Sequence, residues 1–246
     1  MNSISPNLNI MIKACEKASK VIIRDFGELE NLQVKKKGPK DFVTKTDKRV
    51  EEILIQELTK SKKNYSFITE ETGIIKNSNK DTFWIIDPID GTTNFLHGIP
   101  HFAISIALKF NNEIISGVIF DPIKNEIFYA EKNNGSFFNN QRIRVSKKND
   151  LDECLFATNH LGAKYSDLNL RYTGCAALDL AYVGAGRLDG FFHNNINIWD
   201  IAAGAIIVEE AGGKVNDLNN FEINNIDIRA ASSNIYSKML EKLKNF

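Results

Sequence analysis

The chain has 246 residues, long enough for one large domain or two small ones, and 43% of them are hydrophobic, so it can bury a core. Lysine and arginine (31) balance aspartate and glutamate (31), so the net charge is zero, which argues against general electrostatic binding to nucleic acid or to an anionic membrane. The basic run Lys35-Lys36-Lys37 is a local exception, which we interpret as a solvated loop.

Nothing in the sequence is typical of secretion or of membrane insertion. The N-terminus lacks the charged-then-apolar pattern of a signal peptide, and no apolar run is long enough to span a bilayer. Cys15, Cys154 and Cys175 lie far apart, show no zinc-binding spacing, and suit reduced thiols. We therefore expect a soluble, cytoplasmic protein that contacts no membrane.

The N-terminal part predicts two helices followed by a strand. Apolar residues recur at helical spacing over residues 8–26, which indicates an amphipathic helix. A second helix is expected from Thr46 onward. The segment 65–69 then predicts a strand that ends at the acidic pair Glu70-Glu71, and the polar segment 74–81 is expected to be a loop.

The most informative segment follows, around two aspartates. The apolar run 83–86 predicts a buried strand that delivers Asp87 and Asp90 at its carboxyl end. Pro88 restricts the backbone between them, and Gly91 lets the chain turn at once. Like charges at this separation repel and raise each other's pKa, whereas a hard divalent cation removes the repulsion.

Turn formation is the alternative explanation, because Asp-Pro and Asp-Gly are common in turns. Three further acids favour a metal site: Glu70 and Glu71 after the preceding strand, and Asp200 in the segment 198–204. An ordinary N-cap at a helix start is the alternative for Asp200. No His or Cys accompanies these acids, and an all-oxygen ligand set suits Mg²⁺.

The rest of the chain changes character near residue 147. Strand-like runs separated by turn residues first predict an antiparallel meander, at 103–110, 114–120, 126–130 and 136–145. Strands and helices then alternate, with strands at 155–158, 188–193, 214–216 and 228–231 and helices at 175–185, 201–211 and 235–243. We expect an α+β fold, a layered α/β sandwich, with an N-terminal half (1–147) and a C-terminal half (148–246).

Three motifs together resemble the inositol monophosphatase family: the segment 84–95, the Glu70-Glu71 pair, and Trp199-Asp200-x-Ala-Ala-Gly, with residues 41–47 in addition. The resemblance runs from about residue 8 to the C-terminus. It implies the fold shared with fructose-1,6-bisphosphatase and a magnesium-dependent, lithium-sensitive phosphatase that forms a homodimer. One departure is the segment 158–174, which is shorter than in the family, where a helix normally covers one face of the C-terminal sheet.

The resemblance also implies the metal ligands. Glu70, Asp87 and the backbone carbonyl of Ile89 would hold one Mg²⁺. Asp87 would bridge to a second, which Asp90 and Asp200 would also hold.

The expected catalytic residues are Glu70, Thr92 and Asp90, with Thr92 and Glu70 orienting the attacking water. If a short helix begins at Gly91 or Thr92, the free N–H groups of the segment from Asp90 to Thr93 would bind the phosphate. A simple loop is the alternative. For Asp47, helix capping and proximity to a weaker third metal both remain open.

The substrate side is where the resemblance weakens. Ala176 matches a position beside the sugar ring, and Asp90 and Asp200 would contact the substrate as well. Inositol-selective relatives carry an acid seven positions before Asp200, whereas this chain has His193. A carboxylate accepts two hydroxyl hydrogen bonds, but a neutral imidazole offers one donor and one acceptor, so selectivity for polyols could be relaxed or shifted.

Hydrolysis of inositol-1-phosphate is therefore the expected function, with a small sugar or polyol phosphate as the partner. Another small ester (histidinol phosphate, fructose-1,6-bisphosphate or a nucleotide 3′-phosphate) is an alternative. A third possibility is a binding protein, because some bacterial relatives join transcription complexes independently of catalysis. All the expected acids are present, which favours the enzyme, and we expect no direct contact with nucleic acid.

Overall fold

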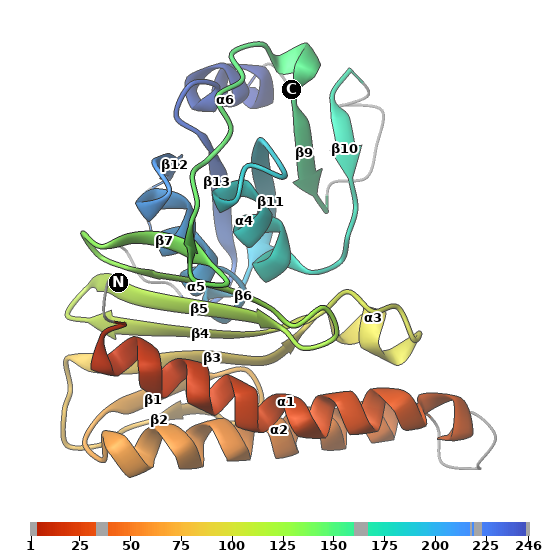
Figure 1. Cartoon of the computed structure of the whole chain (residues 1–246), viewed down its shortest axis with the longest axis vertical. Coiled ribbons are helices and arrows are strands. Elements are labelled where there is room, and N and C mark those ends of the chain that lie inside the picture. The colour runs from red at the N-terminus through yellow and green to blue at the C-terminus, as the bar shows by residue number, and fades with distance from the viewer. Residues whose placement is uncertain (1–3, 33–38, 160–166, 217, 219–222, 245–246) are drawn as a thin grey trace.

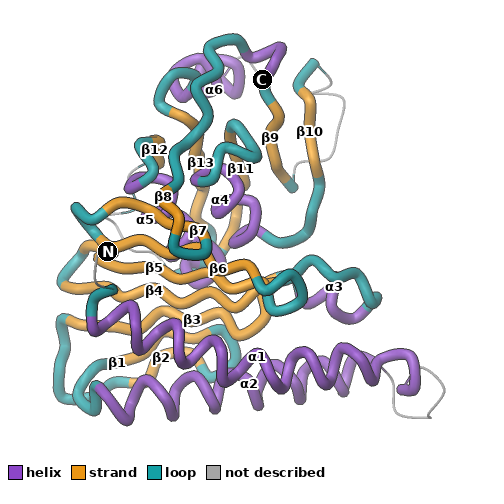
Figure 2. The backbone as a smooth tube through the Cα atoms, in the orientation of Figure 1, coloured by secondary structure: helices purple, strands orange, loops and turns teal. Residues whose placement is uncertain are grey.

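The computed structural model describes residues 4–32, 39–159, 167–216, 218 and 223–244. For residues 30–32 and 39–44 it describes the backbone alone. Helices and sheets alternate in layers: a helix pair, a large sheet, two helices, a smaller sheet and a last helix (Figures 1 and 2). This layered α+β arrangement confirms the expected fold class. The basic run at Lys35 to Lys37 and His160 lie outside the described residues.

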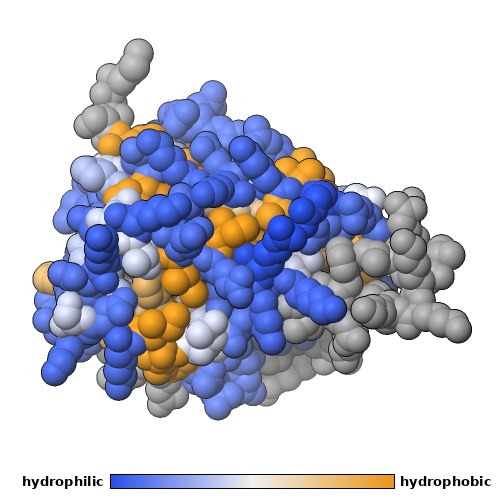
Figure 3. All heavy atoms as spheres, turned by 90° about the horizontal axis from the view of Figure 1, so that it is seen from below, coloured by the Kyte–Doolittle hydropathy of each residue, from blue (hydrophilic) through white to orange (hydrophobic). Residues whose placement is uncertain are grey.

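The first layer is an antiparallel helix pair, α1 (Pro6–Leu32) and α2 (Pro39–Ser61), which lies across the large sheet (Figure 1). The predicted start of α2 at Thr46 was wrong, since the helix begins at Pro39, where a proline is well tolerated in the first turn. Asp47 therefore lies inside the helix and cannot cap it. Seen from this side of the molecule, the surface is mainly hydrophilic with apolar residues between (Figure 3).

The large sheet has eight strands in the order β2-β1-β3-β4-β5-β6-β7-β8. Strands β1 and β3 are parallel, and the other neighbours are antiparallel. The strands are β1 (Ser66–Thr69), β2 (Gly73–Ile75), β3 (Thr82–Asp90), β4 (Ala103–Phe110), β5 (Glu113–Asp121), β6 (Glu126–Glu131), β7 (Gly135–Phe138) and β8 (Gln141–Arg142). The meander prediction is confirmed, whereas β2 lies partly in the segment expected to be a loop.

The smaller sheet has five strands in the order β10-β9-β11-β13-β12. Its members are β9 (Leu155–Thr158), β10 (Asn169–Arg171), β11 (Gly190–Ile196), β12 (Gly213–Val215) and β13 (Ile226–Ser232). Strand β10 is parallel to β9 and forms an edge, so the described part of the shortened segment contributes a strand that the sequence did not predict. A single 3-10 turn, η1 (Leu151–Glu153), precedes this sheet.

Helices α4 (Ala176–Gly184) and α5 (Ile198–Glu210) lie between the sheets, and α6 (Tyr236–Lys244) covers the outer face of the smaller one (Figure 1). Glycines allow α5 to pack closely. A Cβ on Gly117 of β5 would lie 2.7 Å from the Ala203 carbonyl oxygen, and one on Gly204 would collide with Leu180 of α4. The close packing fixes the start of α5 beside β3. No helix in the described part of the chain is both long and apolar enough to cross a membrane.

Candidate metal centre and substrate pocket

An irregularity in β3 places two aspartates on one side of the large sheet. Asp87 pairs with Ser105 of β4 and Asp90 with Ala103, so a step of three residues on β3 faces a step of two on β4. In a regular strand residues three apart point to opposite faces, and the extra residue of the bulge cancels this alternation. Pro88 lies within the bulge, where a strand tolerates the missing N–H. The strand thus continues through the motif instead of ending before it.

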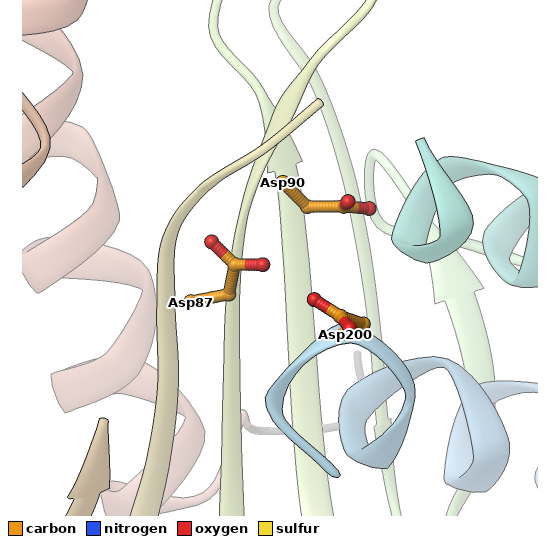
Figure 4. Close-up of side chains that lie close together, drawn as sticks. All are labelled: Asp87, Asp90 and Asp200. Atoms are coloured by element: carbon orange, nitrogen blue, oxygen red, sulfur yellow. The ribbon is translucent and has the colours of Figure 1, made fainter. Parts of the chain in front are cut away.

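The third aspartate comes from α5. One carboxylate oxygen from each of Asp87, Asp90 and Asp200 lies within 4.8 Å of the other two. The three side chains project into one shared space (Figure 4). Asp200 is the third residue of the helix, and its Oδ2 accepts a hydrogen bond from the Asn197 backbone N–H (3.1 Å). Asn197 is the N-cap, so the alternative of Asp200 as the cap itself was wrong.

Burial makes this cluster electrostatically costly without a cation. Asp87 is 1% exposed, and burial raises its pKa well above the usual range, with repulsion from the neighbouring acids adding to the shift. Burial and then repulsion by Asp200 do the same to the pKa of Asp90. The pKa of Asp200 is also raised, chiefly by burial. A divalent cation offsets all three effects, and the oxygen-only ligand set fits Mg²⁺.

Glu70 reaches the cluster from the end of β1. Its backbone N–H donates to the Ile86 carbonyl (3.3 Å), which places it beside Asp87 across the parallel pair. Although Glu70 is exposed as a residue, neighbouring protein atoms displace enough water from its carboxyl to raise its pKa to about 7. Its carboxyl is also a hydrogen-bond partner of Asp87, so Glu70 adjoins the three aspartates.

The remaining expected residues follow on the chain. The buried Ile89 donates its N–H to Asp87 Oδ1 (2.9 Å), and its carbonyl accepts the Thr92 hydroxyl (3.0 Å). The expected short helix is present as α3 (Thr92–Leu96), with Gly91 as its N-cap at φ 93°, a conformation that favours glycine. Thr93 is exposed at its first turn.

A cavity of about 240 Å³ opens next to the aspartates on the side of the smaller sheet. Asp90, Asp200, Ala176 and His193 are all among the residues that line it. Among the described residues, 91–93 do not line this cavity. The residues expected on the substrate side therefore share one cavity with two of the acids, while the hydroxyl-bearing turn adjoins the acids from elsewhere.

Residues 4–245 match the family model described as the inositol monophosphatase family. The chain belongs to this family. The identification covers nearly the whole chain and agrees with the expectation drawn from the three motifs.

Relatives carry two kinds of name. An inositol-1-monophosphatase of Mesorhizobium japonicum is 40% identical over 96% of both chains, and a Nus factor SuhB of Haemophilus influenzae is 39% identical over 98% of this chain and 97% of its own. A crystal structure of the extragenic suppressor protein suhB from Bartonella henselae is 42% identical, with a TM-score of 0.87 over 98% of this chain and 99% of that one. An IMPase of Thermotoga maritima is 36% identical, with a TM-score of 0.82 over 98% of both.

Two residues at the site of this inositol monophosphatase family member were missed by sequence reasoning. Asp179 lines the cavity, is 3% exposed, and accepts a hydrogen bond from the Thr173 hydroxyl (2.8 Å). Burial raises its pKa to about 7. Cys175 lies 3.1 Å from Asp90 Oδ2 through its Sγ. A lone acid in the otherwise apolar stretch 177–183 is the signal that could have indicated Asp179.

Two further acids, Asp47 and Glu71, repel the negative charge of Glu70. Asp47 is 4% exposed, and burial followed by repulsion from Glu70 raises its pKa to about 8. Glu71 is half-buried and its pKa is raised, first by burial and then by the charge of Glu51. Because Asp47 lies within α2 it does not cap the helix, and a role near a weaker third metal stays a prediction.

Proposed function

We propose that this protein is a Mg²⁺-dependent phosphatase that hydrolyses inositol-1-phosphate to inositol and phosphate. The observation that carries the proposal is the cluster of Asp87, Asp90 and Asp200, which adjoins a cavity lined by Ala176 and His193. The membership of the family supports the same reaction class.

The metal ligands we propose are Glu70, Asp87, Asp90, Asp200 and the carbonyl of Ile89. Bound Mg²⁺ would neutralise the charge of the phosphate and lower the pKa of an attacking water. The raised pKa values of the three aspartates support this assignment, because their charges lie together in a partly dry site. The oxygen-only donor set gives further support, since it suits Mg²⁺ better than a softer metal.

Thr92 and Glu70 would orient the water. The Thr92 hydroxyl donates a hydrogen bond to the Ile89 carbonyl, so the hydroxyl oxygen is left to accept a hydrogen bond from a water molecule. The Glu70 carboxylate would accept a second hydrogen bond from the same water. The backbone N–H groups at Gly91, Thr92 and Thr93, at the start of α3, would bind the phosphate oxygens.

The cavity supports a neutral leaving group. Its lining combines amides, a hydroxyl, the His193 imidazole and acids, and no Lys or Arg is among the lining residues that the structure describes. A polyol can hydrogen-bond to such groups, whereas a second phosphate would find no Lys or Arg side chain among these residues. This favours inositol-1-phosphate over fructose-1,6-bisphosphate and over a nucleotide bisphosphate.

The first experiment is magnesium-dependent phosphate release across inositol-1-phosphate, histidinol phosphate, fructose-1,6-bisphosphate, glycerol-2-phosphate and adenosine 3′,5′-bisphosphate. We expect inositol-1-phosphate to lead and the two bisphosphates to be poor substrates. A lead for another ester would assign the specificity to the His193 side of the cavity. Release that persists unchanged in EDTA would contradict the metal-dependent mechanism.

A second candidate function comes from the relatives named Nus factor SuhB. If the protein binds Mg²⁺ but releases phosphate from none of these substrates, a binding role in a transcription complex would be favoured. Co-purification with the transcription machinery, compared between the native chain and Asp90→Asn, separates that role from catalysis. We further propose a cytoplasmic homodimer, which sedimentation of the purified protein tests directly.

A further inference from the structure

A buried glutamate in α2 holds the turn that carries Glu70. Glu51 is 1% exposed, and both of its carboxylate oxygens accept hydrogen bonds from consecutive backbone N–H groups. Oε2 accepts from Glu71 and Oε1 from Thr72, each at 2.9 Å. The contact joins residues about twenty positions apart, so helix α2 is hydrogen-bonded directly to the turn between β1 and β2.

Glu70 is thereby fixed from two directions. Its own N–H donates to the Ile86 carbonyl of β3 at 3.3 Å, a long hydrogen bond that alone constrains it weakly. The next two N–H groups, at Glu71 and Thr72, point to α2 and are held by the Glu51 carboxylate. Hydrogen bonds to an ionised acceptor are shorter and about twice as strong as neutral ones.

Glu51 lies among other acids, so keeping a negative charge at this position is electrostatically unfavourable. Asp47 and Glu51 are four residues apart on α2, so they share a face of the helix, and Glu70 and Glu71 lie opposite. The charge of Glu51 contributes to the raised pKa values of Asp47, Glu70 and Glu71. A neutral side chain would relieve this repulsion, but no neutral side chain accepts two adjacent N–H donors with two equivalent oxygens.

We propose that Glu51 is a positioning residue, which holds the 70–72 turn so that the Glu70 carboxyl faces Asp87 and which thereby sets the affinity of the site for Mg²⁺. This rests on the proposed metal-ligand role of Glu70. Partners that orient a metal ligand typically change metal affinity by about 10-fold to 100-fold when they are altered.

The test compares Glu51→Gln with Glu52→Gln. Glutamine at 51 keeps the size but turns an NH₂ group toward one of the two N–H donors, so the grip on the turn is broken. Glu52 is the exposed neighbour in the same helix, which makes its substitution a matched control for the loss of one negative charge. Mg²⁺ binding is measured by calorimetry on purified protein without substrate, and kcat and the half-saturating Mg²⁺ concentration are measured in parallel.

We expect the Mg²⁺ dissociation constant of Glu51→Gln to rise about tenfold, with kcat restored to within about twofold by saturating Mg²⁺. Glu52→Gln should match the native protein in both. A dissociation constant that stays within about twofold in a folded Glu51→Gln variant, or an equal rise in both variants, would overturn the proposal. A loss of kcat that added Mg²⁺ does not restore would overturn it as well, because that outcome indicates a merely structural role.

Two further measurements keep the result interpretable. If Glu51→Gln does not fold, Glu51→Asp retains both acceptors on a shorter stem, and it should weaken Mg²⁺ binding while circular dichroism shows native helix content. Native binding in Glu51→Asp would count against the proposal. Because calorimetry needs no turnover, failure of the phosphatase proposal leaves this test intact, and unaltered binding in an active enzyme refutes the positioning role alone.

Discussion

Asp90 Oδ2 accepts a hydrogen bond from the backbone N–H of Ala177 at 2.6 Å. A carboxylate on the large sheet therefore caps the N-terminus of helix α4. The N-cap residue of α4, Cys175, gives no side-chain cap of its own, and its thiol donates to the same oxygen. One oxygen of Asp90 is thus held by groups of the protein, and the side chain also belongs to the acidic cluster with Asp87 and Asp200. Asp90 therefore both connects the large sheet to α4 and contributes negative charge to the acidic cluster.

Asp90→Asn should abolish turnover with little loss of fold. The amide oxygen can still accept the Ala177 N–H, but the negative charge at the site is lost, and we expect kcat/KM to fall by about 10³-fold. Asp90→Ala removes the cap as well and should cost about 1 kcal/mol of stability in addition. Phosphate release and urea unfolding of both variants check this. Near-normal turnover in Asp90→Asn would refute the metal assignment.

Cys175→Ala should raise the half-saturating Mg²⁺ concentration by about threefold, because Asp90 Oδ2 loses one of its two donors. Cys175→Ser keeps a hydroxyl donor at the same place and should stay close to the native value. Mg²⁺ titrations of phosphatase activity compare the two variants. Equal behaviour of Ala and Ser would show that the thiol contact does not orient Asp90.

His193→Glu should raise the selectivity for inositol-1-phosphate over glycerol-2-phosphate by about tenfold, since a carboxylate accepts two polyol hydroxyls where the imidazole accepts one. The ratio of kcat/KM values for the two esters is the measurement. His97→Glu is the matched control, because His97 is exposed and is not among the cavity-lining residues that the structure describes. An unchanged ratio would mean that position 193 does not contact the polyol.

The metal-free protein should become more stable as the pH falls from about 8 toward 5. Asp47, Glu70 and Asp179 have pKa values raised to about 8, 7 and 7, so between their ordinary and raised values the folded state binds more protons than the unfolded one. Stability therefore falls as the pH rises through this window, and Mg²⁺ binding weakens as the pH falls because protons compete for Glu70.

Thermal melts in EDTA and in Mg²⁺ across this pH range test the prediction. The gain in melting temperature from Mg²⁺ should be larger at pH 8 than at pH 5.5. Equal gains at the two pH values would show that these carboxyls are ionised in the folded, metal-free protein throughout this range.

The sequence predicted the parts of this molecule that depend on neighbouring residues. The layered α+β class and the family followed from local patterning and from contiguous motifs, and both are confirmed. The start of α3 at Thr92 followed from Gly91 and the hydroxyls after it. The roles of the individual acids and of His193 stay predictions.

The features that were missed depend on contacts between distant segments. Strand β2 forms because its residues pair with β1, and its two isoleucines are too short an apolar run, at the start of an otherwise polar segment, to predict a strand. The hold of Glu51 on the Glu70 turn and the exposure of Asp179 to the cavity join elements far apart in the chain. No periodicity in the sequence encodes which buried acid meets which N–H group.

The bulge in β3 determines on which face of the large sheet Asp90 lies. Asp87 and Asp90 lie three residues apart and share one side of the sheet because these three residues face only two on β4. If the strands paired regularly here, with three residues facing three, Asp90 would point to the other face of the sheet. Surface turns of this fold can gain or lose residues while the acids stay together. The bulge between Asp87 and Asp90 cannot be lost in the same way, and substitutions that restore regular pairing there should separate the two acids without changing the length of the chain.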